Sequence, residues 1–364
     1  METKISRRNM LKKIAIFGGG LAASPPVRIG AGLSALEALV GCATSPEISS
    51  EKSRHVYPKL PGKKIQPYGE GCMIGFMVDD INDRARGGYS WLEMMIGMGP
   101  RIMMPPYREM SPAVVRQHRT FKSEVNVPEK LIMHDVAHTF LFRDITYDLT
   151  GINFSQLADD KPFREKIEIY AKNITKIKRP IFFTTMWEMN GPWWPWSMDS
   201  NNFKKTWRAM HKIFEDNGAN EYATWVWEPY ATFPLIMRDV NPPNLYYPGD
   251  DVVDWIGLSV YRRGGSRAVD KSFNHLGGPS IHNLHRSHKD KPLIISEMGC
   301  TKDSVQPRWF KNAFRYIKKR PYIKAAVIWD SVNVGIGDDH TVSEKSFEVL
   351  KEIFKDSYFI GIRK

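Results

Sequence analysis

Short apolar runs alternate with longer amphipathic segments along most of this chain, from residue 71 onward. Eight runs have the length and composition of buried parallel strands: 72–78, 101–105, 130–134, 180–186, 223–227, 253–260, 292–296 and 324–329. Between them, segments such as 163–178 and 203–214 carry apolar side chains at helical spacing. Eight strand–helix units are typical of a (β/α)8 barrel, the TIM barrel. We therefore predict an α/β fold in which residues 68–364 form a single barrel domain.

A doubly wound open sheet is the alternative arrangement of the same units. Such sheets often bind dinucleotides through a G-x-G-x-x-G turn that follows the first strand. No such turn follows residues 72–78, and the glycines at 18–20 precede the strand pattern. The sequence therefore gives no support to a nucleotide-binding fold.

The charge pattern argues against a nucleic-acid-binding protein, although the net charge is +12. Nucleic-acid-binding proteins gather Lys and Arg on one face or in runs, whereas here basic residues alternate with acids, as in Lys351-Glu352. Cys72 and Cys300 have neither metal-ligand spacing nor the density of a disulfide framework. We predict two free thiols and no metal site.

The first 41 residues resemble an export signal. Arg7 and Arg8 stand before the apolar segment 14–23, and the sequence around them matches the twin-arginine pattern, with Met10 in place of the usual Phe. We predict that the twin-arginine export machinery carries the protein to the periplasm or cell envelope. No later stretch approaches the roughly 20 apolar residues of a membrane-spanning helix.

Cys42 follows Leu39-Val40-Gly41, an order that resembles a bacterial lipobox, in which the cysteine becomes the acylated first residue. This resemblance predicts a lipid anchor on the membrane. In the alternative interpretation, Cys42 is an ordinary linker residue and the signal is cut elsewhere, because prolines and charged residues interrupt the preceding apolar region. Residues 42–67 are rich in Ser, Pro and Lys, which predicts a flexible linker.

Two glutamates stand at the ends of predicted strands, Glu188 shortly after 180–186 and Glu297 directly after 292–296. In a barrel the carboxyl ends of the strands converge on one face, and strands four and seven lie across its mouth. Hydrolysis of a glycosidic bond with retention requires two carboxyl groups about 5 to 5.5 Å apart, one as acid/base and one as nucleophile. The alternative is that each glutamate forms a structural ion pair.

Aromatic residues cluster near the same strand ends, and sugar rings pack their C–H faces on aromatic planes. The cluster includes Trp187, Trp193, Trp194, Trp196, Trp227, Tyr230, Tyr261 and Trp329. Any single tryptophan here is better explained as core, but aromatic residues at four strand ends favour a glycan-binding mouth. Trp225 and Trp255 lie inside their strands and are predicted to be core.

Four segments resemble glycoside hydrolase family 26, the β-mannanases and their β-glucanase relatives. The residues Glu188-Met189-Asn190-Gly191-x-Trp193 are similar to the acid/base motif of that family. Segments 218–229, 246–258 and 291–299 are similar, in the same order, to its fifth-strand, sixth-strand and nucleophile-strand sequences.

The resemblance implies a retaining double displacement with Glu188 as acid/base and Glu297 as nucleophile. It also implies that Tyr261 hydrogen-bonds the nucleophile, that Trp329 lies beneath the sugar at the cleavage point, and that no metal or organic cofactor is needed. The substrate is expected to be a polysaccharide or oligosaccharide. The predicted substrate-binding residues are Trp187, Asn190, Trp193, Trp196, Trp227, Glu228, Tyr261 and Trp329.

Four positions depart from the usual residues of the family and leave the substrate open. Trp187 and Thr184 replace a His and an Arg, Glu228 replaces an Asn or Ser, and Ser259 replaces an acid. An endo-hydrolase of β-1,4-mannan is the first candidate, and a hydrolase of β-1,3-1,4-glucan or of an exopolysaccharide is the alternative. A non-catalytic glycan-binding barrel is the alternative of another class. Glu228 is expected to raise the proton affinity of Glu188, to contact a substrate hydroxyl, or to be an ordinary loop acid. The sequence does not specify the oligomeric state.

Overall fold

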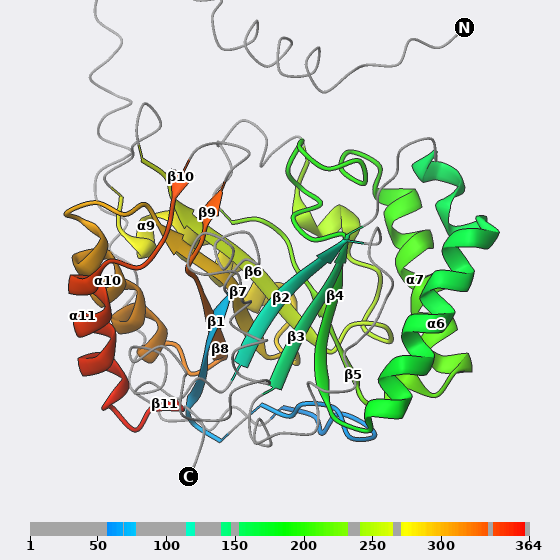
Figure 1. Ribbon diagram of the computed structural model, residues 1–364, viewed down its shortest axis with the longest axis horizontal. Helices are drawn as coiled ribbons and strands as arrows, with labels where there is room; N and C mark the ends of the chain where they lie inside the picture. Colours follow the sequence, from blue (N-terminus) through cyan, green and yellow to red (C-terminus); the bar gives the residue numbers. More distant parts are fainter. Residues whose placement is uncertain are drawn as a thin grey trace, which may run out of the picture. The chain divides into compact units, whose positions relative to one another are not determined.

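Eight parallel strands close into a barrel in the computed structural model, because β1 pairs with both β2 and β8 (Figure 1). The predicted (β/α)8 fold is confirmed. The strands are β1 Cys72–Met77, β2 Val114–Thr120, β3 Phe140–Thr146, β4 Ile181–Thr185, β5 Ala223–Trp227, β6 Trp255–Arg262, β7 Leu293–Cys300 and β8 Ile323–Trp329. The structure describes residues 57–67, 69–77, 153–231, 241–264, 271–333 and 338–360, with the backbone of 114–120 and 140–146.

Six of the eight predicted strands coincide with observed strands to within a few residues. The predictions for the second and third strands are wrong, because β2 and β3 lie after the predicted segments 101–105 and 130–134, which are outside the described residues. Their sequences, VVRQHRT and FLFRDIT, interrupt the apolar residues with charged ones. A search for continuous apolar runs therefore passes over them.

Helices pack on the outside of the barrel, and the two predicted at 163–178 and 203–214 are confirmed as α6 and α7 (Figure 1). Each begins at an aspartate whose side chain accepts a hydrogen bond from a backbone N–H of the first turn, Asp160 for α6 and Asp199 for α7. The described helices are α6 Lys161–Ile177, α7 Ser200–Asp216, α9 Phe273–Ser287, α10 Gln306–Lys318 and α11 Glu344–Phe354. Shorter elements are the 3-10 helices η3 Phe154–Asp159, η4 Ala219–Glu221 and η5 Pro243–Tyr246, and the strands β9 Val332–Asn333, β10 Asp338–Asp339 and β11 Phe359–Ile360, which pairs with β1.

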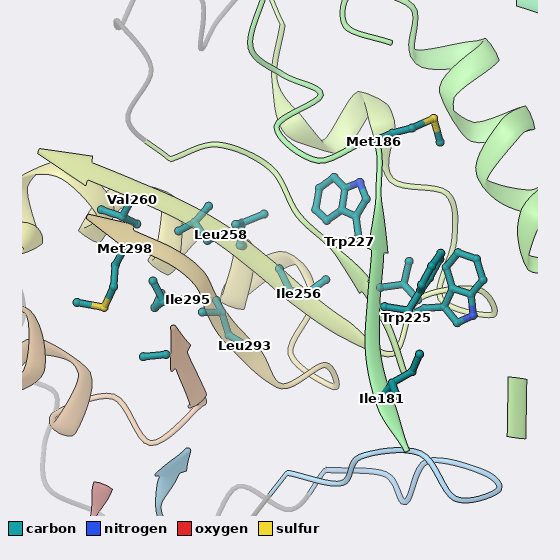
Figure 2. Packing of buried hydrophobic residues seen from close by; sticks show 14 of the residues in the cluster. Ile181, Met186, Trp225, Trp227, Ile256, Leu258, Val260, Leu293, Ile295 and Met298 are labelled. Atoms are coloured by element: carbon teal, nitrogen blue, oxygen red, sulfur yellow. The ribbon is translucent and has the colours of Figure 1, made fainter. Parts of the chain in front are cut away.

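Alternate residues of each strand supply two separate layers of core, since side chains along a strand point to opposite faces. In β5, Trp225 and Trp227 belong to the layer between strands and helices, which Figure 2 shows together with Ile256, Leu258 and Ile295. Val226, between the two tryptophans, belongs to the smaller cluster inside the barrel. Side chains on the inner face of a strand therefore point into the barrel and, near the strand end, toward its mouth. Side chains on the outer face point toward the helices.

Residues 57–67 cross the end of the barrel from which the strands start, drawn in blue in Figure 1. Ile65 is buried in the inner cluster, its N–H donates to Thr224 Oγ1 at 2.8 Å, and its carbonyl accepts from Trp255 Nε1 at 3.1 Å. Lys64 forms a buried ion pair with Asp254 at 2.8 Å. The prediction of a flexible linker over 42–67 is therefore wrong for its last eleven residues. The buried Ile65 side chain closes this end of the barrel and holds the segment in place.

The remaining predictions for the amino-terminal region lie outside the described residues. They are the export signal at 1–41, lipidation at Cys42, and the linker from 42 to 56. Within the described part of the chain, no helix is long and apolar enough to cross a membrane. Cys72 and Cys300 are buried free thiols, as predicted.

Candidate active site

Glu188 lies just beyond β4 in a left-handed backbone conformation, with φ of 54°. Met186, two residues earlier, is also left-handed, with φ of 51°. Such conformations cost free energy for residues other than glycine, and they collect at functional sites where neighbouring contacts enforce them. Here the N–H of Glu188 donates to the carbonyl of Glu228 at 2.7 Å, and the Glu188 carbonyl accepts from Gly191 N–H at 2.8 Å. The turn is thus fixed from both sides.

Glu297 reaches the barrel interior through a bulge in β7. Gly257 of β6 pairs with Ile294, but Ser259, only two residues later, pairs with Glu297, so β7 contains one extra residue. Ile294 belongs to the inner cluster and Met298 to the outer one. Strict alternation from Ile294 would turn Glu297 toward the helices, and the bulge reverses this direction.

Tyr261, on the neighbouring strand β6, donates its hydroxyl to Glu297 Oε2 at 2.5 Å. Its ring lies edge-on to Trp329 with centroids 5.9 Å apart, and both residues are half-buried. Gly299 makes this approach possible, because a Cβ there would lie 2.7 Å from the tyrosine ring. The predicted hydrogen bond between Tyr261 and Glu297 is present in the structure.

Trp193 forms the corresponding contact with the other glutamate. Its indole N–H donates to Glu188 Oε2 at 2.8 Å, and its ring packs edge-on against Tyr230 at 4.9 Å. Gly191 leaves room for the indole, since a Cβ there would lie 2.3 Å from it. Trp193 is 38% exposed and so presents an accessible aromatic surface beside the carboxyl group.

Burial raises the pKa of Glu188 to about 8, and the nearby charges of Glu297 and Glu228 add to the rise. The hydrogen bond from Trp193 and the guanidinium of Arg263 act in the opposite direction. Glu188 is therefore protonated at neutral pH. The effect of Glu297 on this pKa places the two predicted catalytic carboxyl groups within electrostatic reach of each other.

Three tryptophans predicted to bind substrate lie in the core: Trp187, Trp196 and Trp227 are at most 4% exposed. Trp196 donates its indole N–H to the Trp187 carbonyl at 2.9 Å and stacks on Trp194 at 5.1 Å. Trp227 occupies an outer-face position of β5 and packs against Tyr247 at 5.1 Å. Trp227 faces the helices, which corrects its prediction, whereas sugar contacts of Trp187 and Trp196 stay predictions.

Asn190 and Glu228 are also buried and hydrogen-bonded within the protein, and their predicted sugar contacts stay predictions. The Asn190 amide donates to the carbonyl of Tyr230 at 2.9 Å and accepts from its N–H at 2.7 Å, an exchange that ties the β4 and β5 ends together. Glu228 Oε1 accepts from Ser259 Oγ at 3.0 Å. Trp193, Tyr261 and Trp329 remain accessible at the mouth.

Three residues beside the site, Arg263, Asp338 and His340, were not predicted from the sequence. Arg263 donates to the Tyr230 hydroxyl at 3.3 Å and pairs with Asp338 at 3.7 Å. His340 is buried against the Tyr261 ring at 5.3 Å, and burial lowers its pKa to about 4. Arg263 could have been predicted because it follows Tyr261 by two residues at a strand end. The signal for Asp338 and His340 is the Asp-Asp-His sequence after the eighth strand. In the described part of the chain, no group of three or more His, Cys, Asp or Glu could hold a metal ion.

Both glutamates lie in one stretch that is shared with known proteins. Residues 153–313 match the model of glycosyl hydrolase family 26. This stretch begins before β4 and ends within α10, so it includes Glu188, Glu297 and the loops that follow their strands. It comprises less than half of the chain.

The fold is similar to that of solved members of this family. A family 26 β-mannanase from Bacteroides ovatus aligns with a TM-score of 0.55 over 80% of this chain and 91% of that chain, at 16% identity. Among curated proteins, a β-1,3-xylanase from an Alcaligenes species is 23% identical over 150 residues, 41% of this chain and 29% of the relative. Endoglucanase H from Acetivibrio thermocellus is 25% identical over 173 residues, 44% of this chain and 18% of the relative. The chain thus spans less than a third of the length of these curated relatives.

Proposed function

We propose that this protein is a retaining glycoside hydrolase that cleaves β-linked polysaccharide. The observation that carries the proposal is a pair of carboxyl groups in different environments, one just beyond β4 and one within β7. Glu188 holds a proton at neutral pH because its pKa is raised to about 8, and the Glu297 carboxyl group accepts the Tyr261 hydrogen bond at 2.5 Å. An acid and a nucleophile are the two groups that retaining hydrolysis requires.

In the first step, Glu297 attacks the anomeric carbon and forms a glycosyl–enzyme ester, while Glu188 donates its proton to the departing glycosidic oxygen. In the second step, ionised Glu188 takes a proton from water, and the resulting hydroxyl displaces Glu297 from the sugar. Trp193 and Trp329 offer the accessible aromatic surfaces on which the sugars pack. Glu188 ends the cycle protonated again.

β-1,4-Mannan is the proposed substrate, with β-1,3-1,4-glucan or an exopolysaccharide as the alternative. The similarity to a β-mannanase supports the first, and the relatives named as a xylanase and an endoglucanase support a wider range. We also propose export through the twin-arginine pathway to the periplasm or cell envelope and lipidation at Cys42, on the sequence of residues 1–42.

The test is sugar release by the purified protein from mannan, mixed-linkage glucan, cellulose and xylan, compared with Glu188→Ala and Glu297→Ala. Activity on one glycan that both substitutions abolish supports the proposal. Azide should restore turnover in Glu188→Ala on a substrate with a good leaving group, because azide needs no general base. Binding without hydrolysis in all three proteins would instead identify a glycan-binding barrel.

A further inference from the structure

Glu228 is a third carboxyl group at the same end of the barrel, and it is fully buried, with 0% of its surface exposed. It follows β5, which lies between the strand that carries Glu188 and strand β6. Burying a carboxyl group is costly unless its contacts compensate. The retaining mechanism described above has no use for a third acid, so Glu228 needs a separate explanation.

The contacts of Glu228 join the two halves of the proposed active site. Its carbonyl accepts the N–H of Glu188 at 2.7 Å, and its Oε1 accepts the Ser259 hydroxyl at 3.0 Å. Ser259 is in turn the register partner of Glu297. A continuous series of neighbours therefore runs across four adjacent strands, β4 to β7, from Glu188 through Glu228 and Ser259 to Glu297.

Gly257 supplies the space for this side chain. A Cβ at position 257 would lie 3.0 Å from the Cβ of Glu228 and 2.8 Å from Val226 Cγ1, so a larger residue would displace the β5 end. Glycine at position 257 is thus what allows β6 to lie this close to Glu228.

The charges around Glu188 come from several elements. Glu297 from β7 and Glu228 from the end of β5 are negative, whereas Arg263 beyond β6 is positive and shares its charge with Asp338. His340, which packs on Tyr261, is neutral at physiological pH because burial lowers its pKa to about 4. When Glu297 becomes an ester in the glycosyl–enzyme, its negative charge is lost. The ester forms on Glu297 alone, so the Glu228 carboxyl group is not consumed at that stage.

We propose that Glu228 is a positioning residue of the hydrolytic reaction, whose side chain maintains a negative charge beside Glu188 throughout the cycle. The inference rests on the proposed function of Glu188. It explains why a buried acid is paired with a serine that can donate a hydrogen bond to it. The Ser259 hydroxyl stabilises the ionised form of Glu228, and the Glu228 charge favours the proton on Glu188.

The test compares wild type with Glu228→Gln, which keeps the shape and removes the charge. The alkaline limb of the kcat/KM profile should move to lower pH by about one unit, since a nearby like charge shifts a carboxyl pKa on that scale. Ser259→Ala should move the limb in the same direction by less. Glu165→Gln, which removes an exposed acid from α6, should leave the profile unchanged.

A second readout does not require turnover. Trp193 donates to Glu188, so its indole ¹H–¹⁵N signal, one of eleven from tryptophan, should titrate with Glu188 and is assigned by Trp193→Phe. Its midpoint should also fall by about one unit in Glu228→Gln. A chain inactive on every glycan but with a shifted midpoint would reject the proposed hydrolase and retain the electrostatic role of Glu228. If the protein is active but Glu228→Gln shifts neither the alkaline limb of kcat/KM nor the midpoint of the Trp193 signal, the role of Glu228 alone is rejected. If Glu228→Gln does not fold, an unshifted limb and midpoint in Ser259→Ala would reject that role.

Discussion

The Tyr261 hydroxyl donates a hydrogen bond to Glu297 Oε2 at 2.5 Å from the adjacent strand. A hydrogen bond to a charged group contributes about 1.5–3 kcal/mol. Tyr261→Phe keeps the ring contact with Trp329 and removes only this bond, so kcat/KM should fall about 10- to 100-fold through loss of the fixed carboxylate orientation. Steady-state kinetics and a thermal melt on the same sample check this, because a misfolded variant would lose its melting transition as well. Unchanged kinetics in Tyr261→Phe would show that the Tyr261 hydroxyl takes no part in the reaction.

Trp193→Phe should move the alkaline limb of kcat/KM to higher pH. The indole hydrogen bond lowers the pKa of Glu188, so its removal lets that pKa rise further above its ordinary value. KM should rise at the same time, because an exposed aromatic surface is reduced. The direction is opposite to that expected for Glu228→Gln, and a shift toward lower pH in both variants would contradict the electrostatic description of the site.

Glu188→Gln should stabilise the folded protein at alkaline pH. The pKa of Glu188 is raised by folding to about 8, so between its ordinary value near 4.5 and pH 8 the folded state binds more protons than the unfolded state. Stability contributed by this group is therefore complete below the ordinary pKa and is lost as pH rises toward 8. The neutral glutamine does not titrate, so its advantage should grow to about 2–4 kcal/mol at pH 8.5 and vanish near pH 4.

Urea unfolding of wild type and Glu188→Gln at the two pH values measures this difference. Glu165→Gln serves as the matched control, because it removes a carboxyl group that is exposed on α6. Equal advantages of Glu188→Gln at both pH values would show that the substitution acts through packing and not through the proton.

The two glutamates could be predicted from the sequence because each ends an apolar run, where a charged residue is costly without a function. The sequence pattern could not show that Glu297 reaches the interior through a bulge, since the extra residue of β7 becomes visible only in its register with β6. The sequence pattern therefore indicated the two glutamates as candidates, but not the backbone feature that directs one of them.

The aromatic residues show where proximity along the chain is insufficient. Trp193 and Trp196 are three residues apart in one loop, yet the first is 38% exposed and the second 1%. Which indole faces the mouth depends on contacts with residues distant in sequence, such as the packing of Trp193 on Tyr230. In β5, the alternation of faces alone assigns Trp227 to the outer layer, so that misassignment could have been avoided.

Ile65→Ala should destabilise the protein by about 2–4 kcal/mol, because it opens a cavity in the inner cluster at the closed end of the barrel. Ile65 is 2% exposed, whereas Ile169 on α6 is 54% exposed, so Ile169→Ala is the matched control and should change the free energy of unfolding by less than about 0.5 kcal/mol. Activity of the folded Ile65→Ala protein should be retained, since Ile65 contacts the starts of β5 and β6 whereas Glu188 lies beyond the end of β4. Equal unfolding free energies for the two variants would mean that 57–67 behaves as the linker its composition suggests.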